Sequence, residues 1–217
     1  MRWDVVGFIL GWTIRLVALP LALVAAYSCY LEAEGYDFAI RAYLIPLILA
    51  AVVGQSLVSL ARGADIASRL RDREAFASVA LGWIPVVLLG ALPYWLGGVF
   101  YGPAELSMDS VAVTDVMSGA IHSWFESMSG FTTTGSTVID HATSPRCNEG
   151  SDCISSQPQS LILWRSLTQW LGGMGVIMLG LLILSQALGG GMSLARAELT
   201  GPSLSRLGPS LQWTARR

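Results

Sequence analysis

The stretch Ser129–Val138, SGFTTTGSTV, places three threonines and a glycine in a row within a chain rich in apolar helix formers. Threonine hydroxyls and backbone carbonyls are oxygen ligands, and the branched threonine side chain stiffens an extended backbone. Gly135 supplies a conformation that residues with a side chain disfavour. Such a bare backbone can replace the hydration shell of a cation. The residue types favour cation binding, and an ordinary threonine-rich loop is the alternative.

The composition is that of an integral membrane protein. Of the 217 residues, 53% are hydrophobic and 13% are charged, and the mean hydropathy is +0.56. The 15 acids and 13 bases leave a net charge of -2, and every base is arginine. This balance lacks the basic surface of a nucleic-acid-binding protein.

Four stretches are long and apolar enough to cross a bilayer. A hydrocarbon core of about 30 Å needs roughly 20 helical residues. The four stretches are 5–31, 38–61, 76–100 and 160–188. The first is too long for a signal peptide and has no cleavage site followed by a soluble domain, so we interpret it as a membrane helix.

Arginines indicate the orientation of these spans. The linker after the second span holds Arg62, Arg69, Arg71 and Arg73, whereas the linker after the first holds only acids. The positive-inside rule predicts a cytoplasmic N-terminus and linker, and an outer loop containing Cys147 and Cys153. A cytoplasmic tail then requires that the segment between the third and fourth spans leaves and re-enters on one side.

That segment, VAVTDVMSGAIHSWFESMSG, predicts an amphipathic half-helix. Its apolar stripe is Val113, Met117, Ala120, Ile121, Trp124 and Met128, and its polar stripe is Asp115, Ser118, His122, Glu126 and Ser129. About 15 helical residues reach only about 22 Å, so the helix can enter the membrane and stop. Its negative C-terminal end and the following carbonyls favour a cation, and irregular backbone at this depth must line a cavity or pack in protein. We interpret the loop as one wall of an ion filter.

Three motifs carry a resemblance to a known family: WFESMSGFTTTGST, WRSLTQWLGGMGVIMLGLLIL and GGGMSLARAELTGP. They resemble the membrane subunits of Trk/Ktr/HKT potassium transporters, and the Trk type most. The resemblance implies an all-α membrane protein with four repeats of span, pore helix, filter loop and span, preceded by two extra helices. Residues 1–75 would hold the extra helices and a cytoplasmic linker, 76–190 the first repeat, and 191–217 a cytoplasmic tail leading to further repeats.

The same resemblance implies potassium uptake and a set of ligands. Potassium would be the transported ion, held by backbone carbonyls at Thr133, Thr134, Gly135 and Ser136, with Thr132 at the inner end. It also implies a bacterial cytoplasmic membrane, a cytoplasmic nucleotide-binding regulatory subunit and a dimer of membrane subunits. Whether transport is channel-like or coupled to protons or sodium stays open.

A single filter loop supplies about a quarter of a ring. No second threonine-glycine loop follows in the sequence, so we expect the chain to be a fragment of a longer transporter. The alternatives are an assembly of several copies, and a non-conducting membrane scaffold or partner-binding protein.

Several other residues have two interpretations. Glu126 is expected to pair with Arg165 and anchor the half-helix, or else to line an external vestibule. Cys147 and Cys153 share one polar loop and form either a disulfide or two free thiols. Arg15 lies within the first span and can reach toward the cytoplasmic face. Gly172, Gly173 and Gly175 favour close packing or bending of the fourth span.

Other functions are excluded by what their motifs require. The glycine-rich segments are not followed by a lysine, which the chain lacks altogether, so nucleotide binding is rejected. Neither the two histidines nor the cysteines match a zinc pattern. No catalytic constellation is recognisable, and we predict that the protein is not an enzyme.

Overall fold

The computed structural model describes residues 1–31, 38–63, 72–104, 111–147, 150 and 152–187. Within these ranges the chain is helical and has no strand. It divides into two compact units, Met1–Gly173 and Met174–Arg217. Residue 188, where the predicted fourth span ends, and the predicted tail 191–217 lie outside the described residues.

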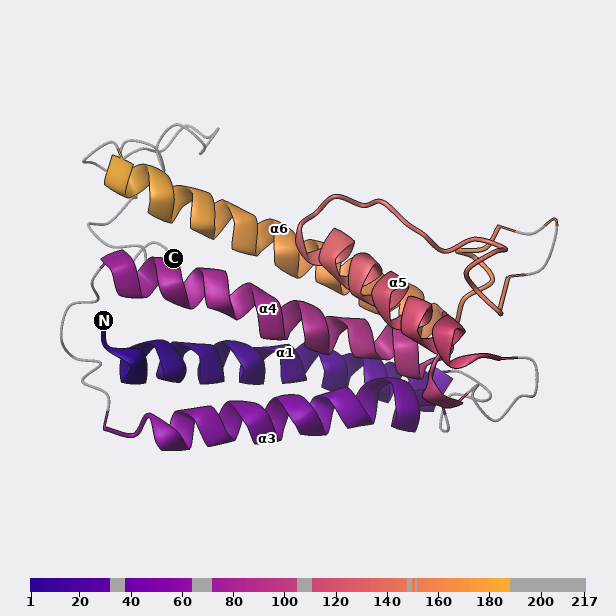
Figure 1. The fold of residues 1–217 in the computed structure, drawn as a ribbon, viewed down its shortest axis with the longest axis horizontal. Helices are drawn as coiled ribbons and strands as arrows, with labels where there is room; N and C mark the ends of the chain where they lie inside the picture. Colours follow the sequence, from indigo (N-terminus) through magenta and orange to yellow (C-terminus); the bar gives the residue numbers. More distant parts are fainter. Residues whose placement is uncertain (32–37, 64–71, 105–110, 148–149, 151, 188–217) are drawn as a thin grey trace. The chain divides into compact units, whose positions relative to one another are not determined.

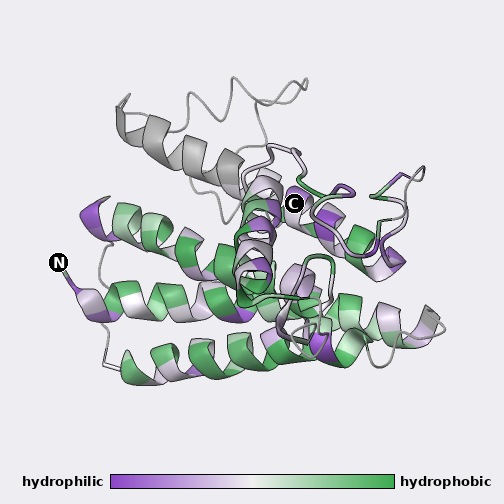
Figure 2. Ribbon diagram, turned by 45° about the vertical axis from the view of Figure 1, so that its right-hand side comes forward, coloured by the Kyte–Doolittle hydropathy of each residue, from purple (hydrophilic) through white to green (hydrophobic). Residues whose placement is uncertain are grey.

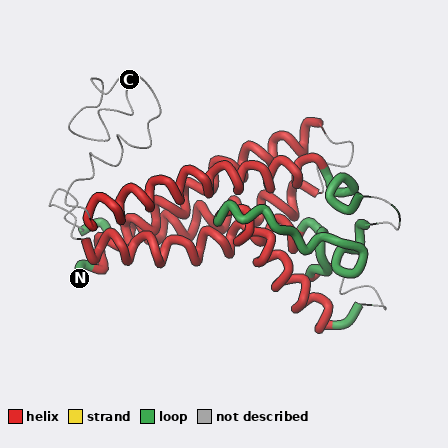
Figure 3. The backbone as a smooth tube through the Cα atoms, turned by 90° about the horizontal axis from the view of Figure 1, so that it is seen from above, coloured by secondary structure: helices red, strands yellow, loops and turns green. Residues whose placement is uncertain are grey.

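Three long apolar helices lie side by side in the first unit (Figures 1 and 3). They are α1 (Trp3–Leu31), α3 (Ile45–Leu60) and α4 (Asp72–Leu96). The segments Trp3–Tyr30, Ile40–Leu60 and Arg73–Leu96 are each long and apolar enough to cross a membrane, which confirms the first three predicted spans. Figure 2 shows hydrophobic residues along most of these helices. Their exposed leucines and isoleucines suit contact with lipid tails rather than water.

Glycines let α1 and α3 pack closely. A Cβ atom at Gly11 would lie 2.8 Å from the carbonyl oxygen of Gly54, so neither position has room for a side chain. A short π-helix, η1 (Ile40–Leu44), leads into α3. Pro46 has no N–H for the carbonyl four residues earlier, which explains the wider helical turn at this point.

The ends of α4 differ from the predicted span 76–100. The helix begins earlier, at Asp72, and the buried carboxylate of Glu74 forms an ion pair with Arg2 at 2.6 Å. It ends earlier, at Leu96, because Gly98 has a φ of 68° that terminates the helix. The ion pair places the start of α1 and the start of α4 at the same end of the bundle.

Helix α5 (Val113–Phe131) covers the segment predicted as a half-helix, but it has 19 residues and is about 28 Å long rather than about 22 Å, so its length alone does not stop it within a bilayer. It begins where Asp115 accepts a hydrogen bond from the Ala112 amide at 2.8 Å. It packs on α4, and the Ser127 hydroxyl donates to the Val87 carbonyl at 2.7 Å. Figure 1 shows α5 starting near the end of α4 and running back along it.

Helix α6 (Gln159–Ala187) covers the predicted fourth span as far as Ala187. Its first half belongs to the first unit, where the Trp164 indole donates to the Gly90 carbonyl of α4 at 3.1 Å. The membrane crossing of α6 stays a prediction.

Candidate functional site

The threonine-glycine loop begins about halfway along α6. A Cβ atom at Gly172 would overlap the Phe131 carbonyl, at the last residue of α5. Gly172 lies 13 residues after Gln159, about 20 Å from the start of the 29-residue helix. From this level the chain runs as an irregular loop back toward the end at which α5 begins (Figures 1 and 3).

The backbone of the loop is unusual at two positions. Gly135 has a φ of 74°, and Thr133 has a φ of 59°, the left-handed region that a β-branched residue strongly disfavours. The Thr133 amide donates to the Gly130 carbonyl at 3.0 Å, and the Thr134 amide to the Ser129 carbonyl at 3.0 Å. Successive N–H groups therefore point at the end of α5.

Side chains from α5 and α6 hold three of the loop carbonyls. Gln169 donates to the Thr133 carbonyl at 3.2 Å, and Arg165 donates to the Gly135 carbonyl at 3.2 Å. The Ser129 hydroxyl donates to the Ser136 carbonyl at 2.6 Å. Arg165 also donates to the Ser136 carbonyl at 3.4 Å. A carbonyl oxygen has two acceptor sites, so these bonds fix the carbonyls and leave those of Thr133 and Gly135 able to bind a further group, whereas that of Ser136 already accepts twice.

Glu126 and Arg165 meet behind the loop. The Glu126 side chain is fully buried and forms an ion pair with the Arg165 guanidinium. Its other oxygen accepts from the Thr137 hydroxyl at 2.6 Å and from the Val138 amide at 2.7 Å. His122, on the same predicted stripe, instead packs against the Phe100 ring. Glu126 thus ties the half-helix, the loop and α6 together.

The oxygens of the loop remain accessible. Thr132, Thr134, Gly135 and Ser136 are exposed, and Thr133 is half-buried. The Thr132 and Thr134 hydroxyls lie 2.9 Å apart. Among the described residues, no hydrogen bond reaches the Thr134 carbonyl. The structure therefore brings all five predicted ligand residues into one short loop with hydroxyl and carbonyl oxygens available to a ligand.

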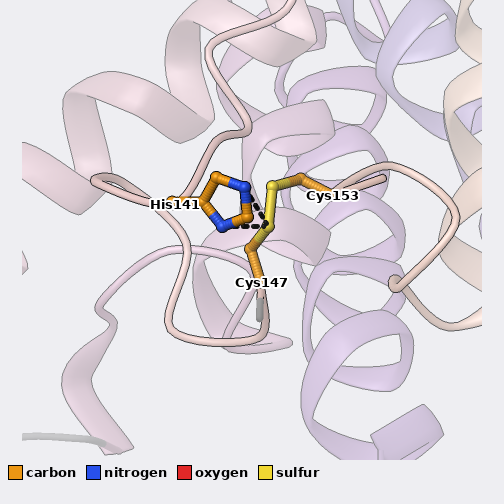
Figure 4. A group of neighbouring side chains, drawn as sticks. All are labelled: His141, Cys147 and Cys153. Carbon is orange, nitrogen blue, oxygen red and sulfur yellow. Dashed lines mark hydrogen bonds between the residues drawn. A yellow bond between two sulfur atoms is a disulfide. The ribbon is translucent and has the colours of Figure 1, made fainter. Parts of the chain in front are cut away.

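A disulfide joins Cys147 and Cys153 in the segment that follows (Figure 4). The His141 Nδ1 atom lies 3.2 Å from the Cys147 sulfur, a proximity that the spacing in the sequence did not reveal. These three side chains could approach one metal ion, but two sulfurs bonded to each other are not thiolate ligands. Arg146 donates to the Gly97 and Gly98 carbonyls at 2.9 Å, which fastens this segment to the end of α4.

Asp140 organises the turn between the loop and the disulfide. Its carboxylate accepts from the Ala142 amide at 2.8 Å and from the Thr143 amide at 3.0 Å. The hydrogen bond from the Ala142 amide, followed by those from Thr143, lowers the pKa of the Asp140 carboxyl.

Sequence reasoning missed Gln169 and did not give Ser129 or Thr137 a role in holding the loop. Gln169 lies one helical turn after Arg165, so the two side chains project from one face of α6. The four-residue spacing from Arg165 was the feature of the sequence that could have pointed to Gln169.

Comparison with known proteins gives a consistent result. Residues 41–208 match the TrkH family model, described as a cation transport protein. The chain is 38% identical over 148 residues to the Trk system potassium uptake protein TrkH of Halomonas elongata, covering 68% of this chain and 25% of that protein. It is 37% identical over 133 residues to TrkH of Escherichia coli K12, covering 61% and 22%. The similarity to TrkG of E. coli K12 is 29% over 211 residues, covering 97% and 36%. No solved structure matches significantly.

Proposed function

Because this chain belongs to the TrkH family of cation transport proteins, we propose that it forms part of a Trk-type potassium-translocating subunit. In this proposal α5 is a re-entrant pore helix, and residues 132–136 form one wall of the filter. Potassium is bound by the carbonyls of Thr133, Thr134, Gly135 and Ser136, and Thr132 lies at the inner end.

The observation that carries the proposal is the left-handed backbone at Thr133. A non-glycine residue in this region costs about 1–2 kcal/mol, and strain of this kind concentrates at binding sites. Here the strain is maintained by donors on two helices, Gln169 and Arg165 of α6 and Ser129 of α5. An ordinary surface loop has no need of such support, whereas a filter must keep its carbonyls in place when the ion leaves.

The chain covers about a quarter of the length of the TrkH relatives. Transport therefore belongs, in this proposal, to a longer protein in which further loops complete the ring. The Glu126–Arg165 pair acts as a structural support behind the loop. The Cys147–Cys153 disulfide acts as a structural support on the outer side of the membrane. A bacterial cytoplasmic membrane, a nucleotide-binding regulatory subunit and a dimer of membrane subunits complete the proposal by resemblance.

Replacing Gly135 in the full-length protein tests the assignment. Gly135→Asp forces a side chain into a position with a φ of 74° and adds a negative charge beside the carbonyls. We expect rubidium uptake by cells lacking other potassium uptake systems to be abolished at a normal protein level. Gly150→Asp is the matched control, because Gly150 has a φ of 86° and also has open space around it, but lies outside the loop. Normal uptake by Gly135→Asp would disprove the filter assignment.

A further inference from the structure

Arg15 is a cation without a carboxylate partner on a membrane-spanning helix. Within the described residues, its guanidinium makes no ion pair or hydrogen bond, and its contact is with the Trp12 ring, 4.5 Å from the ring centroid. Arg2 and Arg165, by contrast, each pair with a buried glutamate, and Arg41, Arg62 and Arg73 lie at or next to the ends of the apolar segments Ile40–Leu60 and Arg73–Leu96. A charge inside a bilayer is costly unless it is paired, so Arg15 stands apart from them.

The position of Arg15 is deep. It lies 12 residues after Trp3 and 16 residues before Leu31, about 18 Å and 24 Å along α1. Stacking on Trp12 draws the guanidinium one turn toward the N-terminus, to a level still about 14 Å from Trp3. The Arg2–Glu74 ion pair marks the polar boundary at that end. Lipid phosphates lie outside the hydrocarbon core, so a phosphate does not reach this level in an undeformed bilayer.

A groove between α1 and α3 opens beside the guanidinium. Its volume is about 640 Å³, and it is lined by Arg15, Ala18, Ala51, Val52, Gln55 and Ser56. The two polar side chains of α3 each make one hydrogen bond within the helix, because Ser56 donates to the Val52 carbonyl and Gln55 donates to Ser59. Small residues in the groove admit another helix at close range, and the guanidinium is the one charged group among the residues that line it.

The chemistry of the occupant follows from charge and depth. A carboxylate carried at the middle of a membrane-spanning helix reaches Arg15, whereas a lipid headgroup does not. A second copy does not supply it from its described residues: Glu74 and Glu126 are already paired, Asp4, Asp72 and Asp115 lie in the first turns of their helices, and Asp140 and Asp152 lie between α5 and α6. We propose that the α1–α3 groove is a docking site for a membrane-spanning helix from outside this chain, with an aspartate or glutamate near its midpoint that pairs with Arg15.

A synthetic peptide tests this directly. The chain is reconstituted in phosphatidylcholine vesicles with a donor dye on Cys29, the exposed free cysteine of α1. The probe is an acceptor-labelled leucine-rich transmembrane peptide with one central aspartate, compared with the same peptide carrying leucine there. We expect about tenfold tighter binding of the aspartate peptide by energy transfer, a difference of about 1.4 kcal/mol. The infrared band of a ¹³C-labelled aspartate should show the ionised form only when the peptide is bound.

Variants of the groove separate the outcomes. Arg15→Leu should remove the preference, and Arg15→Lys should keep it. Ala51→Trp fills the groove but keeps the charge of Arg15, and it should weaken binding of the aspartate peptide. This variant is the alternative test if Arg15→Leu does not insert into the vesicles. Equal binding of both peptides, or a preference that survives Arg15→Leu, would overturn the proposal. Loss of the preference on adding phosphatidylglycerol would assign the groove to anionic lipid instead. None of these measurements depends on potassium flux.

Discussion

At the scale of single residues, the loop is held in a conformation that its own sequence disfavours. Thr133 adopts the left-handed region, and its carbonyl is fixed by Gln169 on α6. The stabilisation comes from outside the loop, through hydrogen bonds and the buried Glu126–Arg165 pair. The number and spacing of rigid carbonyls distinguish one ion from another. The donors that hold the carbonyls are therefore as necessary to the proposed site as the ligands.

The variant Thr133→Gly separates strain from function. Glycine relieves about 1–2 kcal/mol of backbone strain, but it raises the entropy of the unfolded chain by a similar amount. We expect thermal stability within about 1 kcal/mol of the unmodified protein. We also expect a lower ratio of potassium to sodium uptake in the full-length protein, because the loop becomes less rigid. An unchanged uptake ratio, measured with both ions in the same cells, would argue against a selective role for this backbone.

Arg165→Leu leaves the fully buried Glu126 carboxylate without its cation. An unpaired buried charge costs about 3–5 kcal/mol, so this variant should unfold well below the unmodified protein in a detergent melting assay. The double variant Glu126→Gln, Arg165→Leu should recover part of the loss, because a neutral amide oxygen still accepts from Thr137 and Val138. If the double variant were less stable than Arg165→Leu alone, the unpaired buried charge of Glu126 would not be the cause of the instability.

The sequence drew attention to the proposed ligand residues but not to the residues that support them. Three threonines and a glycine carry a chemical signature that stands out in an apolar chain. Gln169 does not, since one glutamine on a long helix has no local feature that reveals a partner 36 residues earlier. Long-range pairs between unlike charges, such as Glu126 and Arg165, can be suggested from the cost of burying either one alone.

At the scale of helices, the sequence predicted the existence of α5 but not which of its stripes packs inside the unit. The buried face consists mostly of small and polar residues, including Gly119, Ser123 and Ser127, while Met117 and Ile121 are exposed. In water, apolar periodicity marks the buried face, but hydrocarbon removes that preference and close packing favours small side chains. The displaced ends of α4 have a different cause, because Gly98 terminates the helix and Glu74 in its first turn pairs with Arg2.

Two adjacent glycines of α6 provide a matched test of this packing. A Cβ atom at Gly172 would collide with the Phe131 backbone, whereas one at Gly173 would lie 3.7 Å from the Thr133 side chain, an ordinary contact. Gly172→Ala should therefore lower the free energy of unfolding by about 1–3 kcal/mol. Gly173→Ala should be neutral or slightly stabilising, because alanine favours a helix. Melting temperatures of the two variants decide the matter, and equal values would mean that α5 and α6 do not meet here.

The turn at Asp140 predicts a pH dependence. Because the folded carboxyl has a lowered pKa, its stabilising effect is present above the pKa of the unfolded chain and is lost as pH falls through the folded pKa. The Cys147–Cys153 disulfide should then be reduced faster by a phosphine in acid, after correction for the reagent's own pH dependence. Asp140→Asn keeps an acceptor oxygen and should show no such acceleration. An identical acceleration in both proteins would assign the effect to another group.

At the scale of the first unit, two sets of polar contacts made by arginines lie at opposite ends of its helix bundle. The Arg2–Glu74 pair joins the beginnings of α1 and α4. Arg146 joins the disulfide-containing segment to the glycines that end α4. Since α4 is long enough to cross a bilayer, these two polar layers would fall on opposite sides of a membrane that it spans. Which of the two layers is cytoplasmic stays a prediction from the arginine-rich linker.

Cysteine accessibility tests the orientation in the full-length protein. In a Cys29→Ser background, Gly63→Cys adds a thiol at a position with open space around it, beside the end of α3. We expect a membrane-impermeant maleimide to label Gly63→Cys only in inside-out vesicles of the bacterial membrane. Without Gly63→Cys, the reduced pair Cys147 and Cys153 should be labelled only from the outer face of spheroplasts. Labelling of both sites from one face would contradict a single crossing by α4, and the proposed depth of α5 and of the loop would then be wrong.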